Sequence, residues 1–369
     1  MSVSTILSNL NGEPMFKMSL GSKELFHSNF LEYLWGVDSN SFKKMICDLL
    51  GDHKVFKSDV EYKLSREKEN FDLCIYHEIG SKLEYDVIIE NKVKSIPSKQ
   101  QLDCYVAKVK GGNTRFLLLS LIENFFDRVE IEKQKLWKIV HYDVLRTGIE
   151  NNYKNVIRKD ATYISDYCSF ISNMHSLQKE IVPNTFINEG LWPDYELYKQ
   201  YRLHDLYIKL RGLKFIELLQ AKLCNAGLSY EIVPVGGFKF RQSWNRNPGQ
   251  KKDVYLNWNV FRAVGQVAVY LYNGGEQIYE IVIQGDQYRH GINYYDLKDK
   301  NISLQGIWKK VQNDDFMNAI QHAGRKNKNY GQYKPDYVYV YERIQSTKIS
   351  DLLDRIVDDI RKQNNANRP

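Results

Sequence analysis

The sequence predicts an α/β protein, with a mixed sheet flanked by helices in its first half and a second, α+β domain behind it. Two observations carry this prediction. Strand-like runs in the first half form a meander and are then joined to a further strand through a helix, and such a crossover implies parallel strands. A group of helix- and strand-breaking residues near position 190 then separates this half from the rest of the chain.

The elements of the first half follow from hydrophobic spacing. Leu25, Phe26, Phe30, Leu31 and Leu34 recur at helical intervals and predict a helix over Lys23–Trp35. The same argument predicts further helices at Phe42–Leu50, Ser98–Lys108 and Ala161–Gln178. Runs rich in apolar, β-branched or aromatic residues predict strands at Lys57–Leu64, Phe71–His77, Tyr85–Lys92, Arg115–Ile122 and Trp137–Tyr142.

The domain boundary is expected in the segment Ile181–Asp194, which contains the breaker residues Pro183, Asn184, Gly190 and Pro193. We therefore expect domains at residues 1–180 and 181–369. The second domain is predicted to have helices at His204–Ala226 and Ile349–Lys362, and strands at Val254–Phe261, Gln266–Tyr272, Gln277–Gln284 and Tyr337–Arg343.

Charge is unevenly distributed along the chain. Residues 1–180 hold 25 Lys and Arg against 25 Asp and Glu, whereas residues 181–369 hold 27 against 20, so the whole excess of +7 lies in the second half. A basic half favours contact with a polyanion. The five cysteines have no zinc-ligand spacing, and we see neither a signal peptide nor an apolar run long enough to span a membrane. A cytoplasmic protein with reduced thiols is expected.

The chemistry is expected on the hairpin Phe71–Lys92, whose turn contains Gly80-Ser81. If Ser81 is the centre of the turn, Asp72 and Glu90 lie opposite each other, and Lys92 shares their face of the sheet. Two facing carboxylates repel, and burial beside Val87-Ile88-Ile89 strengthens the repulsion. A hard cation such as Mg²⁺ would resolve it. The alternative is a charged edge hairpin whose acids and lysine are solvated.

These residues resemble the PD-(D/E)XK nuclease superfamily, and in particular a bacterial branch of it. The resemblance covers residues 20–145 and rests on Glu24-Leu-Phe-His-Ser28, Asp72, Ile88-Ile-Glu-Asn-Lys92 and Gln101-Leu102 with Tyr105. Phe71 stands where the name of the superfamily has a proline. The resemblance implies a restriction-endonuclease-like fold and the hydrolysis of phosphodiesters.

The resemblance also implies roles for individual residues. Asp72, Glu90 and the backbone carbonyl of Asn91 would bind Mg²⁺, with Mn²⁺ as a substitute, and Lys92 would orient the nucleophile. Gln101 would touch the site or the substrate backbone, although it is equally consistent with a polar surface residue. Glu24 would add a metal contact or orient Lys92, or it is an ordinary acid in the first turn of a helix. His27 is either a supporting group or structural. Asp59 and Glu61 are reserve ligands.

Two segments of the second domain mix basic and aromatic residues, as nucleic-acid-binding surfaces do. The alternative is a pair of solvated basic loops. The candidate nucleic-acid-binding residues are Lys239, Arg241, Trp244, Arg246, Lys251, Lys252, Arg325, Lys326 and Lys328.

The sequence thus predicts a Mg²⁺-dependent endonuclease that cuts nucleic acid, with DNA as the expected substrate and bacterial antiviral defence or restriction as the expected setting. One alternative is a nucleic-acid-binding protein on an inactive nuclease fold. Another is a nuclease switched on by a ligand or partner protein that the C-terminal domain senses. Because cutting both strands commonly requires two active sites, a homodimer is also expected.

Overall fold

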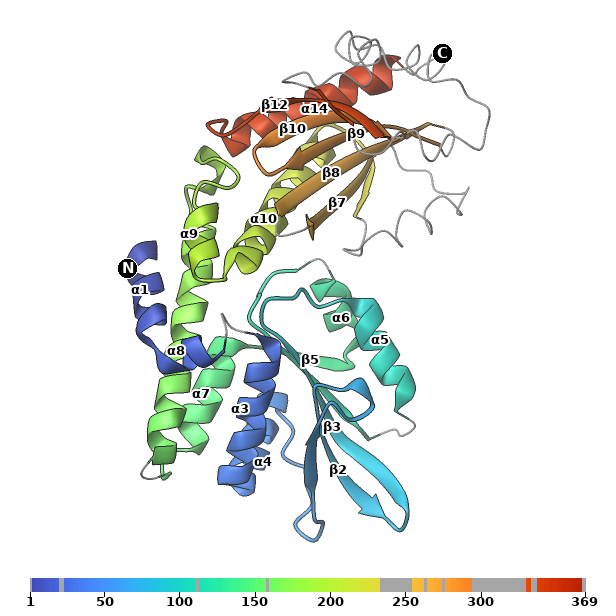
Figure 1. Cartoon of the computed structure of the whole chain (residues 1–369). Coiled ribbons are helices and arrows are strands. Elements are labelled where there is room, and N and C mark those ends of the chain that lie inside the picture. The colour runs from blue at the N-terminus through green and yellow to red at the C-terminus, as the bar shows by residue number, and fades with distance from the viewer. Residues whose placement is uncertain are drawn as a thin grey trace. The chain divides into compact units, whose positions relative to one another are not determined.

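A computed structural model describes residues 2–19, 23–109, 113–125, 127–156, 159–232, 254–261, 264–273, 276–293, 330–332 and 337–366. The chain divides into two compact units, shown together in Figure 1. Unit 1 comprises Met1–Ile181 and Leu197–Leu206, and unit 2 comprises Val182–Glu196 and Tyr207–Pro369.

Unit 1 is built on a five-stranded mixed sheet in the order β1-β2-β3-β4-β5. The first three strands form an antiparallel meander, while β3, β4 and β5 run parallel. Helix α5 connects β3 to β4, so the predicted crossover is confirmed. The strands are β1 (Lys63–Arg66), β2 (Leu73–Ile79), β3 (Lys82–Lys92), β4 (Arg115–Ser120) and β5 (Trp137–His141).

Helices cover both faces of this sheet (Figure 1). One face carries α3 (Glu24–Val37), α4 (Ser39–Leu50) and α7 (Tyr142–Asn152), and the other carries α5 (Lys99–Lys108) and α6 (Arg128–Gln134). Outside α7 lies α8 (Lys159–Ile181), against which α1 (Val3–Gly12) and α2 (Pro14–Met18) pack. The arrangement is the predicted α/β architecture, a mixed sheet flanked by helices.

The inner strand β3 is the buried strand that the sequence predicted. Val87, Ile88 and Ile89 are each 0% exposed. Side chains alternate along a strand, so Ile88 and Glu90 face one way and Ile89 and Asn91 the other. Ile88 packs in a core cluster with Leu102 of α5, which identifies the α5 face as the side that also holds Glu90.

The register of the β2–β3 hairpin depends on one extra residue. Near the tip, Ile79 pairs with Lys82 across a two-residue turn whose Gly80 has φ 62°, a left-handed conformation that glycine adopts without strain. Ile75 pairs with Val87 and Tyr76 pairs with Tyr85, so Asp86 has no partner on β2 and is the extra residue of a β-bulge.

Beyond the bulge, Leu73 pairs with Ile89. Continuing this pairing by one residue places Asp72 opposite Glu90, as the sequence predicted. The expected turn centred on Ser81 was wrong, and the bulge restores the alignment. Without the bulge, Asp72 would face Ile89 instead. The bulged Asp86 is held by His77, whose Nδ1 lies 2.7 Å from the Asp86 carboxylate.

Some predicted elements of unit 1 were wrong. The expected strand Lys57–Leu64 is a loop up to Tyr62, whose hydroxyl accepts a hydrogen bond from the backbone N–H of Lys57, and β1 begins only at Lys63. Helix α7 starts at Tyr142, where a strand was expected to end. The sequence prediction had also left out α1, α2 and α6.

Unit 2 contains a seven-stranded sheet in the order β11-β12-β10-β9-β8-β7-β6. The predicted helices and strands of this half are present, within a few residues at their ends, whereas β6, β10, β11 and α9 were not predicted. The strands are β6 (Tyr230–Ile232), β7 (Val254–Phe261), β8 (Val264–Asn273), β9 (Glu276–Gln284), β10 (Gln287–Asn293), β11 (Tyr330–Gln332) and β12 (Tyr337–Arg343). The helices are α10 (His204–Asn225), which enters unit 2 at Tyr207, and α14 (Ile349–Ala366), while most of α9 (Tyr195–Gln200) belongs to unit 1.

A buried arginine organises the start of unit 2. The side chain of Arg211 is 2% exposed, and its guanidinium donates to the carbonyls of Leu191 and Gly190, each at 2.7 Å, and to Glu189 at 3.0 Å. These bonds satisfy a charge that would otherwise be costly to bury. In the part of the chain that the structure describes, no helix is long and apolar enough to cross a membrane.

Burial of β3 predicts a large effect for truncating one of its core side chains. We expect Ile88→Ala to lower the free energy of unfolding by about 2 to 5 kcal/mol, because it leaves a cavity between the sheet and α5. Urea denaturation monitored by circular dichroism measures this loss. Leu83, on the same strand but 38% exposed, is the control. If Leu83→Ala destabilises the protein as much as Ile88→Ala, the burial described for β3 is incorrect.

Candidate active site

The structure brings four of the predicted site residues together at the carboxyl end of β3, on the α5 face of the sheet. Asp72 directly precedes β2, Glu90 and Lys92 end β3, and Gln101 lies in the first turn of α5. Glu90 is 0% and Lys92 8% exposed, whereas Asp72 and Gln101 are half-buried. The group is therefore embedded in the core on one side and accessible at Asp72 and Gln101.

Glu90 is the centre of this group. Its Oε1 lies 2.6 Å from Nζ of Lys92 and accepts a hydrogen bond from Nε2 of Gln101 at 2.8 Å. The same Gln101 nitrogen donates to the Tyr105 hydroxyl at 3.0 Å. Gln101 and Tyr105, one helical turn apart, thus face the hairpin together, and Gln101 is part of the site rather than a surface residue.

The second carboxylate oxygen of Glu90 has a different environment. Oε2 is buried, and no N–H or O–H group of the described residues donates to it, although the Asp72 carboxyl lies close enough to share a proton with Glu90. A buried carboxylate oxygen without a donor is costly unless the group is protonated or a cation is bound.

The pKa values of the three charged residues reflect the burial of two carboxylates beside one lysine. Burial, together with the charge of Asp72, raises the pKa of Glu90 to about 7, although Lys92 acts in the opposite direction. Burial also raises the pKa of Asp72, although the Asn91 N–H and Lys92 oppose the shift. Burial by itself would lower the pKa of Lys92, but Glu90, Glu24 and Asp72 outweigh it and raise the pKa. Lys92 therefore stays protonated, and its single charge faces more than one carboxylate.

Asn91 contributes its backbone to the site and its side chain to the opposite face. Its backbone N–H donates to Oδ2 of Asp72 at 2.8 Å. The N–H and C=O of one strand residue point to the same side. The Asn91 carbonyl therefore also lies on the Asp72 side, which agrees with its predicted role as an oxygen ligand.

Glu24, at the start of α3, supports the backbone that follows Lys92. Its Oε1 accepts hydrogen bonds from the backbone N–H groups of Val93, at 3.1 Å, and Ser95, at 2.9 Å, and from the Ser95 hydroxyl. Of the roles considered for Glu24, the orientation of the Lys92 segment is the one these contacts favour.

His27 is a structural residue. It is 1% exposed, its Nδ1 lies 2.9 Å from the Tyr167 hydroxyl, and burial lowers its pKa to about 3, so the ring is neutral.

The oxygen-rich group fits a hard divalent cation with few protein ligands. Mg²⁺ is typically bound by one or two carboxylates, with substrate phosphates and waters as its remaining ligands. Asp72, Glu90 and the Asn91 carbonyl would hold it, and the buried Oε2 of Glu90 is available for it. Among the described residues, no cluster of three or more His, Cys, Asp or Glu side chains could hold a metal. The donor set is thus a pair of carboxylates with backbone support.

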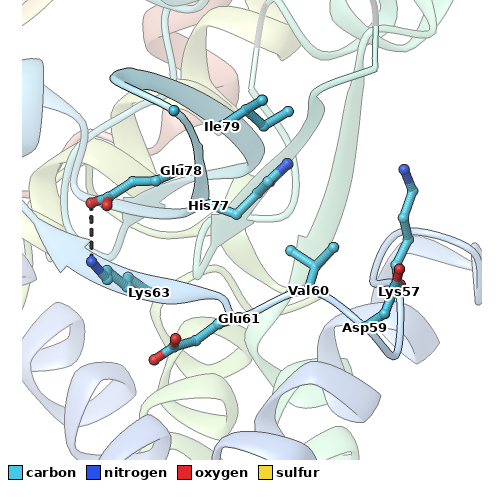
Figure 2. Close-up of a pocket in the computed structure, with 9 residues that line it drawn as sticks. Lys57, Asp59, Val60, Glu61, Lys63, His77, Glu78 and Ile79 are labelled. Carbon is cyan, nitrogen blue, oxygen red and sulfur yellow. Dashed lines mark hydrogen bonds and ion pairs between the residues drawn. The ribbon is translucent and has the colours of Figure 1, made fainter.

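The reserve ligands Asp59 and Glu61 lie elsewhere. They line a pocket at the opposite end of β2, between the loop at 57–61 and the hairpin residues His77 and Glu78 (Figure 2). There Lys63 donates to Glu78 at 3.0 Å, and the two side chains point toward each other (Figure 2). Since Asp72 precedes the other end of the same strand, Asp59 and Glu61 are not part of the active-site group.

The candidate nucleic-acid-binding residues of the second domain fall outside the described residues, and this applies to every one from Lys239 to Lys328. Two residues near the site were given no role in the sequence analysis, although Ser28 belongs to the Glu24–Ser28 motif. Tyr142 and Ser28 hold the Asn91 side chain from α7 and α3. Tyr142 begins an apolar helical repeat with Leu145 and Ile149, a pattern from which α7 could have been predicted.

The fold and site define a mixed α/β unit with a buried acid–acid–lysine group at the end of an inner strand. Comparison of the chain with protein-family models, with curated proteins and with solved structures finds no match.

The raised pKa of Glu90 predicts how metal-free stability depends on pH. The unfolded carboxyl has a pKa near 4.5 and the folded one about 7, so folding takes up a proton between these values. Because the unfolded state binds fewer protons in this range, stability is lost as the pH rises from about 5 to 8. We expect the melting temperature in EDTA to fall over this range, and to fall less in Glu90→Gln, which cannot ionise.

The test compares the melting temperatures of the two proteins at several pH values. The difference between them removes the pH dependence of every titratable group that both proteins contain. A difference between wild type and Glu90→Gln that is constant from pH 5 to 8 would contradict the raised pKa.

Proposed function

We propose that this protein is a Mg²⁺-dependent endonuclease with a restriction-endonuclease-like fold, hydrolysing phosphodiesters of nucleic acid, with DNA as its substrate. The resemblance of the motifs around Glu24, Asp72, Glu90 and Lys92 to the PD-(D/E)XK superfamily supports this assignment. It also extends the proposal to a role in bacterial defence or restriction.

The observation that carries the proposal is the unbalanced charge at the end of β3. Two carboxylates, Asp72 and Glu90, approach each other in a largely buried position, and one oxygen of Glu90 has no donor among the described residues. A purely structural ion pair would need one carboxylate for Lys92. The second acid, held by a backbone N–H in a half-buried position, suits the binding of a divalent cation and a phosphate.

Each residue of the group has a role in this chemistry. Bound Mg²⁺ would polarise the phosphate and lower the pKa of a water molecule. Lys92, protonated through its carboxylate neighbours, holds a phosphate oxygen or the attacking water and offsets the charge that develops on the phosphate. Gln101 fixes Oε1 of Glu90, and the Asn91 N–H fixes Oδ2 of Asp72, so neither carboxylate has to reorganise during the reaction.

The half-buried position of the group is suited to such a substrate. Asp72 and Gln101 remain partly accessible, whereas Glu90 and Lys92 lie beneath them. A phosphate of an extended chain can approach from the Asp72 side, and the buried surroundings strengthen its interactions with the charged groups.

We expect Asp72→Ala and Lys92→Ala each to reduce Mg²⁺-dependent cleavage by about 100-fold or more, because each removes a charge needed in the transition state. The measurement is incubation of the full chain with supercoiled plasmid and, separately, with RNA, in the presence of Mg²⁺, Mn²⁺ or EDTA. Cleavage of RNA without cleavage of the plasmid would identify RNA, not DNA, as the substrate. Cleavage in EDTA would exclude the metal-dependent mechanism.

Asp59→Ala and Lys63→Ala are the matched controls, since they remove an acid and a lysine from the pocket at the far end of β2. Both should cleave as the wild type does. Activity that survives Asp72→Ala and Lys92→Ala would refute the assignment. Binding of duplex DNA with no cleavage under either metal would favour an inactive nuclease fold.

A further inference from the structure

The side chain of Asn91 is anchored on the face of β3 opposite the carboxylates. It is 0% exposed, and its Nδ2 donates to Oγ of Ser28 at 3.2 Å and to the backbone carbonyl of Glu24 at 3.4 Å. Its Oδ1 accepts a hydrogen bond from the Tyr142 hydroxyl. Two helices, α3 and α7, therefore hold one carboxamide.

The anchoring groups are themselves fixed. Ser28 and Tyr142 are both buried, and the His27 ring packs edge-on against Tyr142 with the ring centroids 5.4 Å apart. His27 is in turn hydrogen-bonded to Tyr167 of α8. Side chains held in this way have few alternative rotamers, so they restrict the group they bind.

The backbone of the same residue serves the active site, because its N–H binds Asp72 at 2.8 Å. Asp72 lies outside the β2 ladder, so this bond and the side-chain contact with Glu90 are what tie it to β3. A rotation of the Asn91 peptide would move the Asp72 carboxylate and the Asn91 carbonyl together. Glu24 holds the next backbone groups, Val93 and Ser95, so the strand end on both sides of Lys92 is restrained.

We propose that Tyr142 and Ser28, acting through the Asn91 carboxamide, are positioning residues that set the distance between the Asp72 and Glu90 carboxylates and so the affinity of the site for a divalent cation. This inference rests on the proposed function, because it takes the carboxylate pair as the metal site. Neither Tyr142 nor Ser28 touches the substrate. Their hydrogen bonds lie on the far face of the sheet and act through the backbone.

Tyr142→Phe tests the proposal, because it removes one hydroxyl and leaves the ring. We expect it to weaken Mn²⁺ binding to the full chain by about 10- to 100-fold, the usual effect of losing a group that orients metal ligands. Isothermal titration with Mn²⁺ in the absence of nucleic acid measures the affinity. The Mg²⁺ concentration that half-saturates cleavage should rise by a similar factor, with kcat largely recovered at saturating Mg²⁺.

Tyr153→Phe is the matched control. Tyr153 is another buried tyrosine of this helical layer, and its hydroxyl donates to the Leu34 carbonyl at 2.9 Å, with no bond to Asn91. Its loss should leave Mn²⁺ affinity unchanged. Equal effects of the two substitutions, or no effect of Tyr142→Phe, would overturn the proposal, as would a wild-type chain that binds no Mn²⁺.

If Tyr142→Phe does not fold, Ser28→Ala provides the same test with a smaller change. Its control is Ser19→Ala, which removes a buried hydroxyl that donates to the Phe16 carbonyl at 2.6 Å.

The two proposals fail in different ways. A wild-type chain that binds Mn²⁺ through Asp72 and Glu90 but cuts neither DNA nor RNA refutes the nuclease and leaves the positioning role measurable by titration.

Discussion

The interaction on which the site depends is the burial of two carboxylates beside one ammonium at the end of an inner strand. Asp72 and Glu90 are brought together by the hairpin, and Lys92 can neutralise only one of them. Burial raises the pKa of both acids, so the metal-free site binds an additional proton in the neutral range. Under the proposed function, protons and divalent cations would compete for the same carboxylate pair, and the surrounding protein would set the balance between them.

Much of the surrounding structure can be understood as support for that pair. Gln101 orients Glu90 from α5, and the Asn91 backbone orients Asp72. On the other face, α3 and α7 hold the same strand end through Glu24, Ser28 and Tyr142. The site is thus fixed from both sides of the sheet, which is what a preorganised electrostatic site requires, because groups that are already oriented need not rearrange as charge develops.

The sequence predicted the carboxylate pair from strand alternation and from a turn centred on Ser81, and that turn centre was wrong. With the two-residue turn Gly80-Ser81, the pair aligns only because the bulge at Asp86, which no local pattern indicated, shifts the register by one residue. Helix α7 was not predicted, although Tyr142, Leu145 and Ile149 recur at helical spacing, because Gly148 lowers helix propensity. The structure shows why a glycine is there: a Cβ at this position would lie 3.3 Å from Leu49 of α4, so the two helices can approach closely. The sequence also did not indicate that the Tyr142 hydroxyl binds the Asn91 side chain, because the two residues are 51 positions apart in the chain.

The bulge at Asp86 has a consequence for how the length of this hairpin can change in evolution. Each residue added to or removed from one strand exchanges the two faces of everything beyond it. The extra residue at position 86 and the two-residue turn at Gly80-Ser81 together determine which face Glu90 occupies. Deletion of the bulged residue alone would leave Asp72 opposite the same glutamate, with the two-residue turn unchanged. If the residue at position 86 instead joined the ladder, the turn would have to be longer by one residue to keep the acid pair aligned. The spacing of 17 residues between the two acids is therefore a less constant feature of such a site than their alignment.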